Sequence, residues 1–600
     1  MQEMTNPTPV EWDRSKTITD LLKDKLAADP SRTQWERKSS IGSDWRPVSV
    51  AQFVDEVKHV AAGMLASGVE VGDRVGIMCR TRYEWTLLDF ASWWVGAIPV
   101  PIYETSSADQ ALYIGQNAEL TMIFVETPAQ ALVARGLQSE VPSLREILVV
   151  DDGAIDTLTE RGQDVDPAVL EERSKALTGD DVATIIYTSG TTGRPKGVIL
   201  KHSNFVFLTH SGRLGFHDVC NKPTSRTLLF LPLAHVFARF IQVLCVATPT
   251  VAGHSPDTKN LISDVGGFKP TYILAVPRVF EKIYNSADAK AGTGAKLKIF
   301  RWSSKVAIEY SKALEEPGGP SVTLKARHKV ASKLVLGKLM DLLGGNVEYA
   351  VSGGAPLGNR LGHFFRGVGI NILEGYGLTE TTAPLSCNLP DRTKIGTVGV
   401  PFPQASVRIS ETGEIETAGD HVFHGYWKND EATAEAFDDG WFKTGDLGGI
   451  DEDGYVTITG RAKDIIVTGA GKNVSPAQLE DGMRGHPIIS QVLVVGNGKP
   501  FIGALITLDS EMLPGWLENH DLPSMTVKQA GKDERVLAAI DRAVHRANES
   551  VSRAESIRKF TVLGEDFTEE NGLLTPSMKV KRGATEARFA KEIKELYGEA

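Results

Sequence analysis

Short apolar runs alternate with longer segments of helical period through much of the chain. Arg74–Cys79 and Thr121–Val125 are short and apolar, whereas Glu84–Trp94 between them is longer and rich in aromatic residues. The same alternation resumes at Thr227–Leu231 and Thr271–Ala275. Strands that alternate with helical segments predict parallel α/β layers with helices on their faces. We therefore expect two layered α/β units, with Trp85, Trp93 and Trp94 as core aromatics.

The pattern changes in the last third of the chain. Residues 400–460 contain short β-type runs separated by Gly and Asp turns, which predict a small β-barrel-like subdomain. Beyond them, Val492–Val495 and Ala504–Leu508 read as strands and Val536–Val551 as a helix, as in a small α+β unit. The charged segment Lys290–Lys338 has helical period and is expected to be a solvated helical excursion. The predicted fold class is thus α/β, followed by a small α+β domain.

A dense cluster of glycine, hydroxyl and basic residues lies between two apolar runs. Tyr187–Gly197 separates the predicted strands Ala183–Tyr187 and Val198–Leu200. Most Gly/Ser/Thr clusters are surface loops, but this one is denser than a linker requires. Bare N–H groups in such a turn bind anions, hydroxyls add donors and a lysine adds charge. The residues that suit a triphosphate are Thr188, Ser189, Gly190, Thr191, Thr192, Gly193 and Lys196.

Length and composition exclude several classes of protein. Six hundred residues exceed one ordinary core, so two or more domains are expected. A net charge of −11 argues against a nucleic-acid partner, and the 4 cysteines have neither zinc nor disulfide spacing. The start of the chain lacks a signal peptide and Phe240–Pro256 is too interrupted to span a bilayer. We expect a cytoplasmic protein; peripheral membrane contact and oligomeric state stay open.

Three further stretches place reactive side chains after predicted strands, where α/β sheets bind ligands. His235 lies in Leu231–Phe237, where we expect Pro232 to open a helix; a lone histidine there is more often structural. The small-residue turn of Gly353, Gly354 and Ala355 lets a planar base approach the backbone. The third stretch offers a stacking ring, a turn and a hard oxygen ligand for Mg²⁺, and its residues are Tyr376, Gly377, Thr379 and Glu380.

Together these motifs resemble the adenylate-forming superfamily. Thr188–Gly197 has the form of its phosphate loop, and the His235, Gly353–Ala355 and Tyr376–Glu380 motifs follow in the family order. The resemblance runs from about Thr17 to Arg582 and is to long-chain fatty acyl-CoA synthetases, which form AMP. It implies ATP, Mg²⁺ and coenzyme A, with a long-chain fatty acid as substrate. It also implies metal contacts from Thr188 and Glu380, ribose contacts from Asp446, nucleotide contacts from Arg461, and His235 near the acyl group.

The resemblance divides the chain into an N-terminal domain of residues 1–462 and a mobile C-terminal domain of residues 463–600. It makes Lys463 the hinge and assigns the turn at Gly469, with Lys472, to the second step. The adenylation lysine is expected in Leu574–Arg582, where this chain has Met-Lys in place of the family Gly-Lys. Lys579 is the candidate catalytic residue, with Lys581 as the alternative, beside Lys196 and His235.

Four interpretations remain at this point. The first is fatty-acid activation to an acyl-adenylate and transfer to coenzyme A, a thiol supplied from outside the chain. The second is a fatty acyl-AMP ligase that passes the acyl group to a carrier protein. The third is an amino-acid adenylation domain, which needs an early acidic residue that we do not find. The fourth is a nucleotide-binding scaffold without catalysis.

Overall fold

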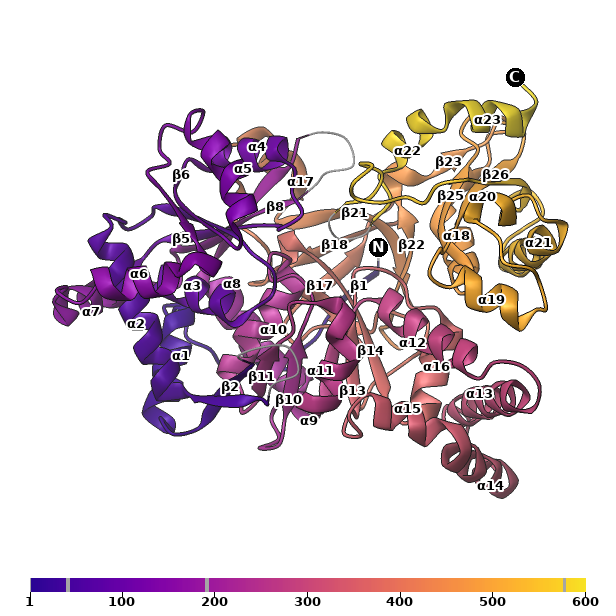
Figure 1. Ribbon diagram of the computed structural model, residues 1–600, viewed down its shortest axis with the longest axis horizontal. Coiled ribbons are helices and arrows are strands. Elements are labelled where there is room, and N and C mark those ends of the chain that lie inside the picture. Colours follow the sequence, from indigo (N-terminus) through magenta and orange to yellow (C-terminus); the bar gives the residue numbers. More distant parts are fainter. Residues whose placement is uncertain (1, 39–43, 189–193, 576–578, 600) are drawn as a thin grey trace.

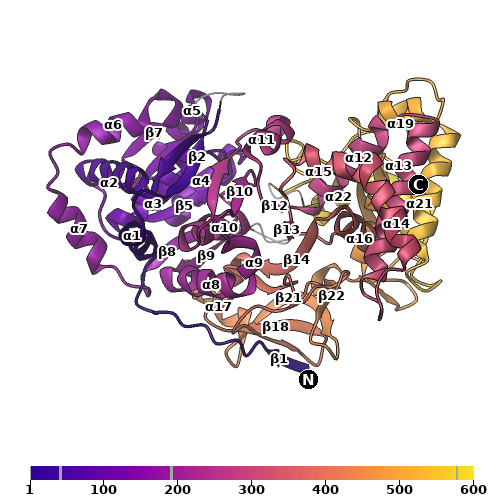
Figure 2. The same cartoon turned by 90° about the horizontal axis from the view of Figure 1, so that it is seen from below.

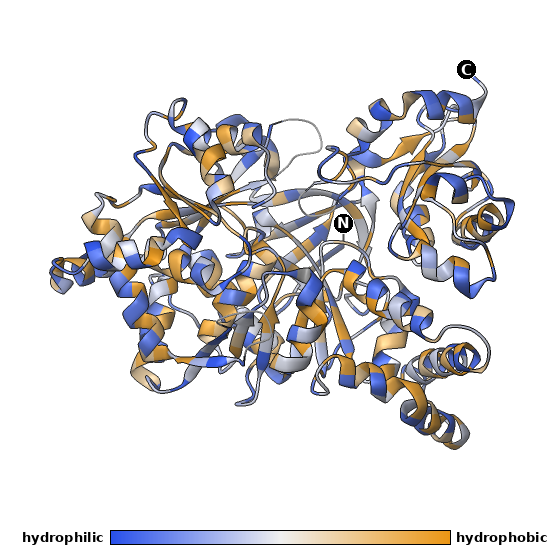
Figure 3. Cartoon of the chain, in the orientation of Figure 1, coloured by the Kyte–Doolittle hydropathy of each residue, from blue (hydrophilic) through white to orange (hydrophobic). Residues whose placement is uncertain are grey.

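The computed structural model describes residues 2–38, 44–188, 194–575 and 579–599 (Figure 1). Residues 189–193 of the expected phosphate loop therefore lie outside the described residues. Thr188 and Lys196, on either side of them, are described. Figure 3 shows that the central strands are mainly hydrophobic and that the outer helices carry the hydrophilic positions. Within the described residues, no helix combines the length and the apolarity needed to cross a membrane.

The first α/β unit is a parallel sheet in the order β5-β4-β6-β7 with helices packed around it. Three of its helices start at short polar residues: Ser49, Ser107 and Thr127 each form a capping box with the third helical residue. Its elements are β4 (Arg74–Met78), β5 (Ile98–Ile102), β6 (Leu120–Val125), β7 (Glu146–Val149), α2 (Val50–Ala66), α3 (Tyr83–Val95), α4 (Ala108–Ala118) and α5 (Pro128–Gln138).

The second unit contains two further sheets, in which parallel pairs are followed by antiparallel edge strands. One has the order β10-β11-β2-β3 and the other the order β12-β13-β14-β15-β16. Their strands are β2 (Thr33–Arg37), β3 (Arg46–Ser49), β10 (Arg226–Leu229), β11 (Val251–His254), β12 (Tyr272–Ala275), β13 (Tyr349–Ser352), β14 (Asn371–Leu378), β15 (Ala383–Cys387) and β16 (Val400–Pro401). The parallel pairs β12–β13 and β13–β14 confirm the predicted layering.

A mostly antiparallel sheet then forms the predicted β subdomain. It follows the order β1-β17-β18-β21-β20, with β22 paired to β21, and lies centrally in Figure 1 and at the lower edge of Figure 2. Its strands are β1 (Gln2–Thr5), β17 (Ser406–Ile409), β18 (Glu414–Ala418), β20 (Phe437–Asp438), β21 (Trp441–Ile450) and β22 (Val456–Arg461). The N-terminal strand therefore belongs to a sheet whose other strands come from after residue 400.

The C-terminal part is a separate α+β unit on the right of Figure 1. In its sheet β25 pairs antiparallel and β27 pairs parallel with the central strand β26. Its elements are β25 (Ile489–Val495), β26 (Ile502–Leu508), β27 (Ile557–Val562), α18 (Pro476–Arg484), α19 (Leu513–Asn519), α21 (Glu534–Asn548), α22 (Arg582–Arg588) and α23 (Ala590–Tyr597). The α/β and α+β fold classes predicted from the sequence are thus confirmed.

The core of the first unit contains a completely buried ion pair. Arg239 of α10 (Val236–Ala247) and Asp89 of α3 have no exposed side-chain surface. The guanidinium lies between the rings of Trp85 and Trp93, 5.5 and 5.1 Å from their centroids. It also donates to Oγ1 of Thr184 over 2.6 Å, so α10 is bonded to β8 (Val182–Thr188). The three predicted core tryptophans are all buried, at 0%, 0% and 1% exposure.

The segment Lys290–Lys338, which we expected to be a solvated helical excursion, is solvated only in part. It contains α13 (Ala295–Ala313) and α14 (Val322–Ala331), and Val322 is indeed 84% exposed. One face of α13, however, packs against α16 (Asn359–Val368). A Cβ on Gly367 would lie 2.1 Å from the carbonyl oxygen of Ala307, so only glycine permits this approach. The many charged residues of this segment predicted solvent exposure, but one face of α13 is buried against α16.

Candidate functional site

Two strands enclose the expected phosphate loop. β8 and β9 (Lys196–Lys201) are antiparallel, and their register places Thr188 opposite Lys196. Oγ1 of Thr188 donates to the carbonyl oxygen of Lys196 over 3.4 Å, a weak contact that leaves the hydroxyl available to a stronger ligand. Ser189, Gly190, Thr191, Thr192 and Gly193 lie outside the described residues, so their assignment stays a prediction.

The lysine of this loop lies next to the expected metal-binding carboxylate. Nζ of Lys196 is 4.8 Å from the ring centroid of Tyr426, whose hydroxyl donates to Oε1 of Glu380 over 2.9 Å. Glu380 belongs to η4 (Thr379–Thr381), a turn of 3₁₀-helix directly after β14. Burial raises the pKa of Glu380, while the Tyr426 hydrogen bond and the charges of Arg461 and Lys196 oppose that rise. A nearby cation would favour the ionised carboxylate.

The expected ribose-binding residue is part of a hydrogen-bonded network. The hydroxyl of Tyr376 donates to Oδ2 of Asp446 over 2.6 Å, and Nε of Arg461 donates to Oδ1 over 3.0 Å. Asp446 and Arg461 are directly opposite each other on β21 and β22. Each oxygen of the Asp446 carboxylate retains a second acceptor position. Because Asp446 and Arg461 are directly opposite each other, their charged groups lie on the same side of the β subdomain. Tyr376 is 9% exposed.

Glycines let backbone segments approach each other beside Tyr376. A Cβ on Gly377 would lie 1.7 Å from the carbonyl oxygen of Ala383, and a Cβ on Gly353 would lie 3.3 Å from that of Gly375. Gly354 has a φ of 84°, which side chains rarely adopt. The turn at Gly353–Ala355, buried at Gly353 and exposed at Gly354 and Ala355, therefore lies against the strand that carries Tyr376.

The loop before α10 orients the candidate histidine. Nδ1 of His235 accepts the backbone N–H of Phe237 over 3.2 Å, which makes His235 the N-cap of α10 and places the proton of the neutral ring on Nε2. Burial, and then the charge of Lys579, lowers the pKa of His235 to about 4. The prediction that Pro232 opens the helix is wrong. A turn closed by the His235 N–H and the Pro232 carbonyl precedes the helix, because the histidine side chain supplies the cap.

Lys579 reaches this site from the far end of the chain. Burial and the charge of Arg461 lower its pKa, while Asp446 and Glu380 oppose that shift, so its amine lies near both carboxylates and near His235. Taken as a whole residue, Lys579 remains exposed. Lys581 instead provides the N-cap residue of α22. Of the two candidate lysines, Lys579 is the one gathered with the other predicted residues.

The segment around Lys579 is tied firmly to the C-terminal domain. The N–H of Thr575 donates to the carbonyl oxygen of Lys579 over 2.8 Å, and the Lys579 N–H donates back to Oγ1 of Thr575 over 3.1 Å. Three residues later, Arg582 forms an ion pair of 2.7 Å with Glu480 and donates to the carbonyl oxygen of Val494. The lysine backbone is therefore anchored on α18 and β25.

Polar contacts join the C-terminal domain to the rest of the chain. Arg278 of α12 (Pro277–Lys290) pairs with Asp509 over 2.6 Å, and Lys282 pairs with Glu511 over 3.1 Å. Figures 1 and 2 both show α19 beside α12 at this junction. On another part of the boundary, Oγ1 of Thr105 donates to Glu569 over 2.7 Å. The junction is thus held mainly by charges and hydroxyls.

A buried carboxyl group on β14 is influenced by the charge of a second carboxyl on α18. Glu374 of β14 accepts the backbone N–H of Leu357 over 3.0 Å, which ties β14 to the turn after Gly353–Ala355. Burial, with a smaller contribution from the charge of Asp481 on α18, raises its pKa to about 7. Burial likewise raises the pKa of Asp481 to about 7 although Arg484 pairs with it over 2.8 Å.

Family models match most of this chain. A model described as AMP-binding enzyme matches residues 26–427, and one described as AMP-binding enzyme C-terminal domain matches residues 463–600. The chain belongs to the AMP-binding enzyme family. The resemblance expected from its motifs is thereby confirmed.

Individual relatives and structures extend the match to the whole chain. The long-chain-fatty-acid–CoA ligase FadD15 of Mycobacterium tuberculosis is 47% identical over 601 residues, which cover 100% of both chains. The long-chain-fatty-acid–CoA ligase ACSBG2 of Xenopus laevis is 30% identical over 94% of this chain and 81% of its own. The structure of ATP-bound MatB from Rhodopseudomonas palustris superposes with a TM-score of 0.69 at 23% identity, over 96% and 99% of the two chains. That structure supports the fold alone.

Three predicted residues of this AMP-binding enzyme lie apart from the cluster. Lys463 is exposed in η5 (Ala462–Asp464), immediately after Arg461. The N–H of Gly469 donates to the carbonyl oxygen of Lys499 over 2.8 Å, and Lys472 pairs with Glu555 over 3.2 Å. Both partners belong to the C-terminal domain. The hinge and second-step roles of these residues stay predictions.

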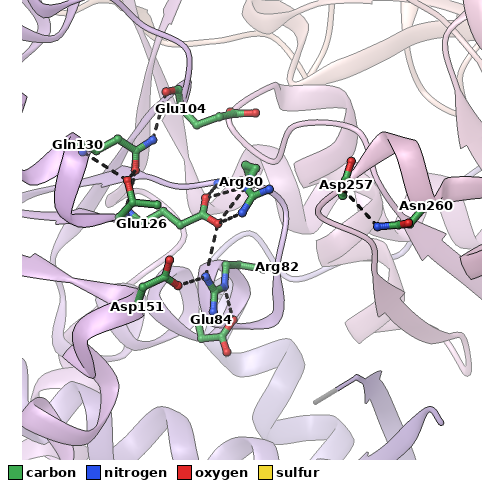
Figure 4. Close-up of polar contacts among 10 residues, drawn as sticks. Arg80, Arg82, Glu84, Glu104, Glu126, Gln130, Asp151, Asp257 and Asn260 are labelled. Carbon is green, nitrogen blue, oxygen red and sulfur yellow. Dashed lines mark hydrogen bonds and ion pairs between the residues drawn. The ribbon is translucent and has the colours of Figure 1, made fainter. Parts of the chain in front are cut away.

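Sequence reasoning missed a charged cluster at the carboxyl edge of the first sheet of this AMP-binding enzyme (Figure 4). Arg80 after β4 binds Glu126 after β6 over 2.6 Å, and Arg82 pairs with both Glu84 and Asp151. The signal was available, because these residues directly follow apolar runs, where ligands of α/β sheets bind. Since the guanidinium groups are already paired with carboxylates, we interpret the cluster as a brace between strand ends.

Proposed function

We propose that this enzyme joins a long-chain fatty acid to coenzyme A through an acyl-adenylate, releasing AMP and pyrophosphate. The observation that carries the proposal is the hydrogen-bonded group of Tyr376, Asp446 and Arg461, with bonds of 2.6 and 3.0 Å, which the charge of Lys579 also reaches. The names of the relatives at 47% and 30% identity supply the substrate class. The proposal includes a cytoplasmic location.

The first step needs two anions held together. A carboxylate oxygen attacks the α-phosphorus of ATP, the bond to the β-phosphate breaks, and pyrophosphate leaves. Strands β8 and β9 hold the ends of the phosphate loop, with Lys196 as its cation. Lys579 adds positive charge where the carboxylate and the α-phosphate meet, and such preorganised charge lowers the barrier because the groups need no reorganisation.

The donor set fits a magnesium ion. Glu380 offers a hard carboxylate and Thr188 a weakly engaged hydroxyl, and Mg²⁺ takes few protein ligands besides phosphate oxygens and water. Among the described residues there is no cluster of three or more His, Cys, Asp or Glu suited to a metal. When bound, the ion would neutralise phosphate charge. His235, with its pKa near 4, is neutral at pH 7 and adds no competing charge beside the acyl carboxylate.

The second step needs the lysine to be withdrawn. The sulfur of coenzyme A attacks the acyl carbon, the bond to the phosphate oxygen breaks, and AMP leaves. We propose that the C-terminal domain, residues 463–600, turns at Lys463 and brings the Gly469 turn and Lys472 toward the adenylate. The polar junction of Arg278–Asp509 and Lys282–Glu511 supports this proposal, because charged partners can be solvated when the domains part.

A direct product assay tests the proposal. The enzyme is incubated with palmitate, ATP, Mg²⁺ and coenzyme A, and both pyrophosphate and palmitoyl-CoA are measured. We expect the two products in equal amounts, and acyl-adenylate with pyrophosphate but no thioester when coenzyme A is omitted. Adenylate that accumulates in the presence of coenzyme A, with no thioester, would reject the assignment and favour transfer to a carrier protein.

A further inference from the structure

One sequence motif near the site has so far no role. Gly425–Asn429 follows the β subdomain strand β18, and its first two residues form β19 (Gly425–Tyr426). β19 pairs antiparallel with β9, with Tyr426 opposite Val198. The N–H of Trp427 donates to the carbonyl oxygen of Gly197 over 2.7 Å. This motif is therefore bonded to the backbone immediately after Lys196.

The side chain of Tyr426 lies between two candidate phosphate-site residues from different segments. Its hydroxyl donates to Oε1 of Glu380 over 2.9 Å, and its ring lies 4.8 Å from Nζ of Lys196. The residue is 9% exposed. Burial, and then the charge of Glu380, raises the pKa of the phenol, so the hydroxyl remains a donor at neutral pH.

These contacts differ from ordinary packing of a core tyrosine. The ring does pack against Phe423, with centroids 4.9 Å apart, and that contact needs no hydroxyl. A hydrogen bond to one carboxylate oxygen fixes the plane of the carboxylate and hence the direction in which the other oxygen points. An ammonium close to an aromatic ring is held there by the ring quadrupole. The hydroxyl and the ring thus have separable consequences.

We infer that Tyr426 is a positioning residue, whose hydroxyl aims the Glu380 carboxylate at Mg²⁺ and whose ring holds the Lys196 ammonium for the phosphates of ATP. The inference rests on the proposed function, because it assigns ATP and Mg²⁺ to the same site. It links three segments that are distant in sequence, since Lys196 and Tyr426 are 230 residues apart. Tyr426 itself touches neither substrate in this assignment.

Equilibrium binding tests the inference without relying on turnover. Binding of ATP to purified wild-type enzyme and to Tyr426→Phe is measured by calorimetry over a series of Mg²⁺ concentrations. For Tyr426→Phe we expect the Mg²⁺ concentration at half-saturation to rise about tenfold, as when a partner of a metal ligand is removed. ATP binding in EDTA should stay unchanged, because the ring that holds Lys196 is retained.

A second variant separates the two roles. Tyr426→Leu should show the same Mg²⁺ shift and in addition bind ATP in EDTA about threefold more weakly, because Lys196 loses its aromatic contact. The matched control is Tyr455→Phe, since Tyr455 also has a lysine near its ring, Lys394 at 5.2 Å, but lies outside the site. The control should bind ATP and Mg²⁺ as the wild type does.

Each outcome has a distinct meaning. If wild type and Tyr426→Phe bind MgATP with the same Mg²⁺ dependence, the inference is overturned while the proposed function stands. If the wild type fails to bind MgATP at all, both are overturned. Should Tyr426→Leu fail to fold, as its melting curve would reveal, the Tyr426→Phe titration alone decides the question of the hydroxyl.

Discussion

Two arginine–aspartate pairs in this enzyme lie in opposite surroundings. Arg239 and Asp89 are sealed inside the first α/β unit, between two tryptophans. Arg278 and Asp509 join the two domains and are 29% and 8% exposed. The first pair fixes α10, which carries His235, to the strand that leads into the phosphate loop. The Arg278–Asp509 pair instead holds the C-terminal domain, which must move relative to the rest of the chain in the proposed cycle.

The comparison shows how one chain combines rigidity and movement. Charges buried without water are costly to separate, so they lock the elements that must keep their geometry. Charged groups at a partly solvent-exposed domain boundary can exchange their protein partners for water at little cost in free energy. The predictions below test this division, from the largest expected effect to the smallest.

Breaking the sealed pair should have the largest effect. Arg239→Met leaves the Asp89 carboxylate buried without its partner, and removing one member of such a pair costs about 3–5 kcal/mol of stability. Urea unfolding of the variant measures this loss. The double variant Arg239→Met, Asp89→Leu should recover most of it, because no charge is then buried; a single variant as stable as the wild type would contradict the interpretation.

Removing the lysine delivered by the other domain should affect chemistry and leave folding intact. Lys579→Ala should slow pyrophosphate release by about a hundred- to a thousand-fold, equivalent to about 2.7–4 kcal/mol in the barrier. Lys581→Ala is the control and should keep the wild-type rate, since that residue serves as the N-cap of α22. Equal rates for Lys579→Ala and the wild type would refute its assignment.

The carboxyl pair at the junction should make stability depend on pH. Because burial raises the pKa of Glu374 to about 7, the native state keeps a proton that the unfolded chain loses near pH 4.5. Stability should therefore fall as pH rises from about 4.5 to 7 and level off above 7, by about 3 kcal/mol. Urea unfolding of Glu374→Gln at several pH values should show a flatter profile, and a profile parallel to that of the wild type would exclude Glu374 as its origin.

The groups around Glu374 affect the size of this slope. The charge of Asp481 contributes to the raised pKa of Glu374, and Asp481 also has a raised pKa, with Arg484, Glu480 and Glu281 near that second carboxyl. The first proton taken up by the pair relieves the repulsion of the second carboxyl, so the two titrate together. Asp481→Asn should consequently flatten the same region of the profile.

The smallest effect is expected at the outer edge of the junction. Lys282 and Glu511 are 53% and 75% exposed, and such pairs contribute about 0–1 kcal/mol. Lys282→Ala should leave urea unfolding almost unchanged. A loss comparable to that of Arg239→Met would show that the junction is as rigid as the core and would remove the contrast between the two regions.

Local patterns were sufficient to predict much of the fold. The runs that became β4, α3, β8, β9 and β12 are short, apolar and bounded by turn residues, so their neighbours in sequence determine them. The same holds for the motifs of the site, whose residues are contiguous. Pairings over long distances have no such signal. Nothing near Tyr376 indicates that its hydroxyl binds Asp446, 70 residues away.

Some missed features did leave a trace in the sequence. Arg239 is a lone cation within the apolar helix Val236–Ala247, and a charge there requires a buried partner. The partner, Asp89, could not be identified, because the crossing of α3 and α10 is a tertiary event. Likewise, the charges of residues 290–338 predicted solvent exposure and concealed the face of α13 that packs on α16.

The anchoring of Arg582 has a consequence for how the catalytic cycle can proceed. Because Glu480 and Val494 hold this arginine three residues from Lys579, the Arg582 end of the segment is tied to α18 and β25. In the proposed cycle the lysine would therefore arrive and leave together with the whole C-terminal domain. An inhibitor wedged far from the nucleotide, against α18 or β25, would stop the enzyme as effectively as one that fills the nucleotide site.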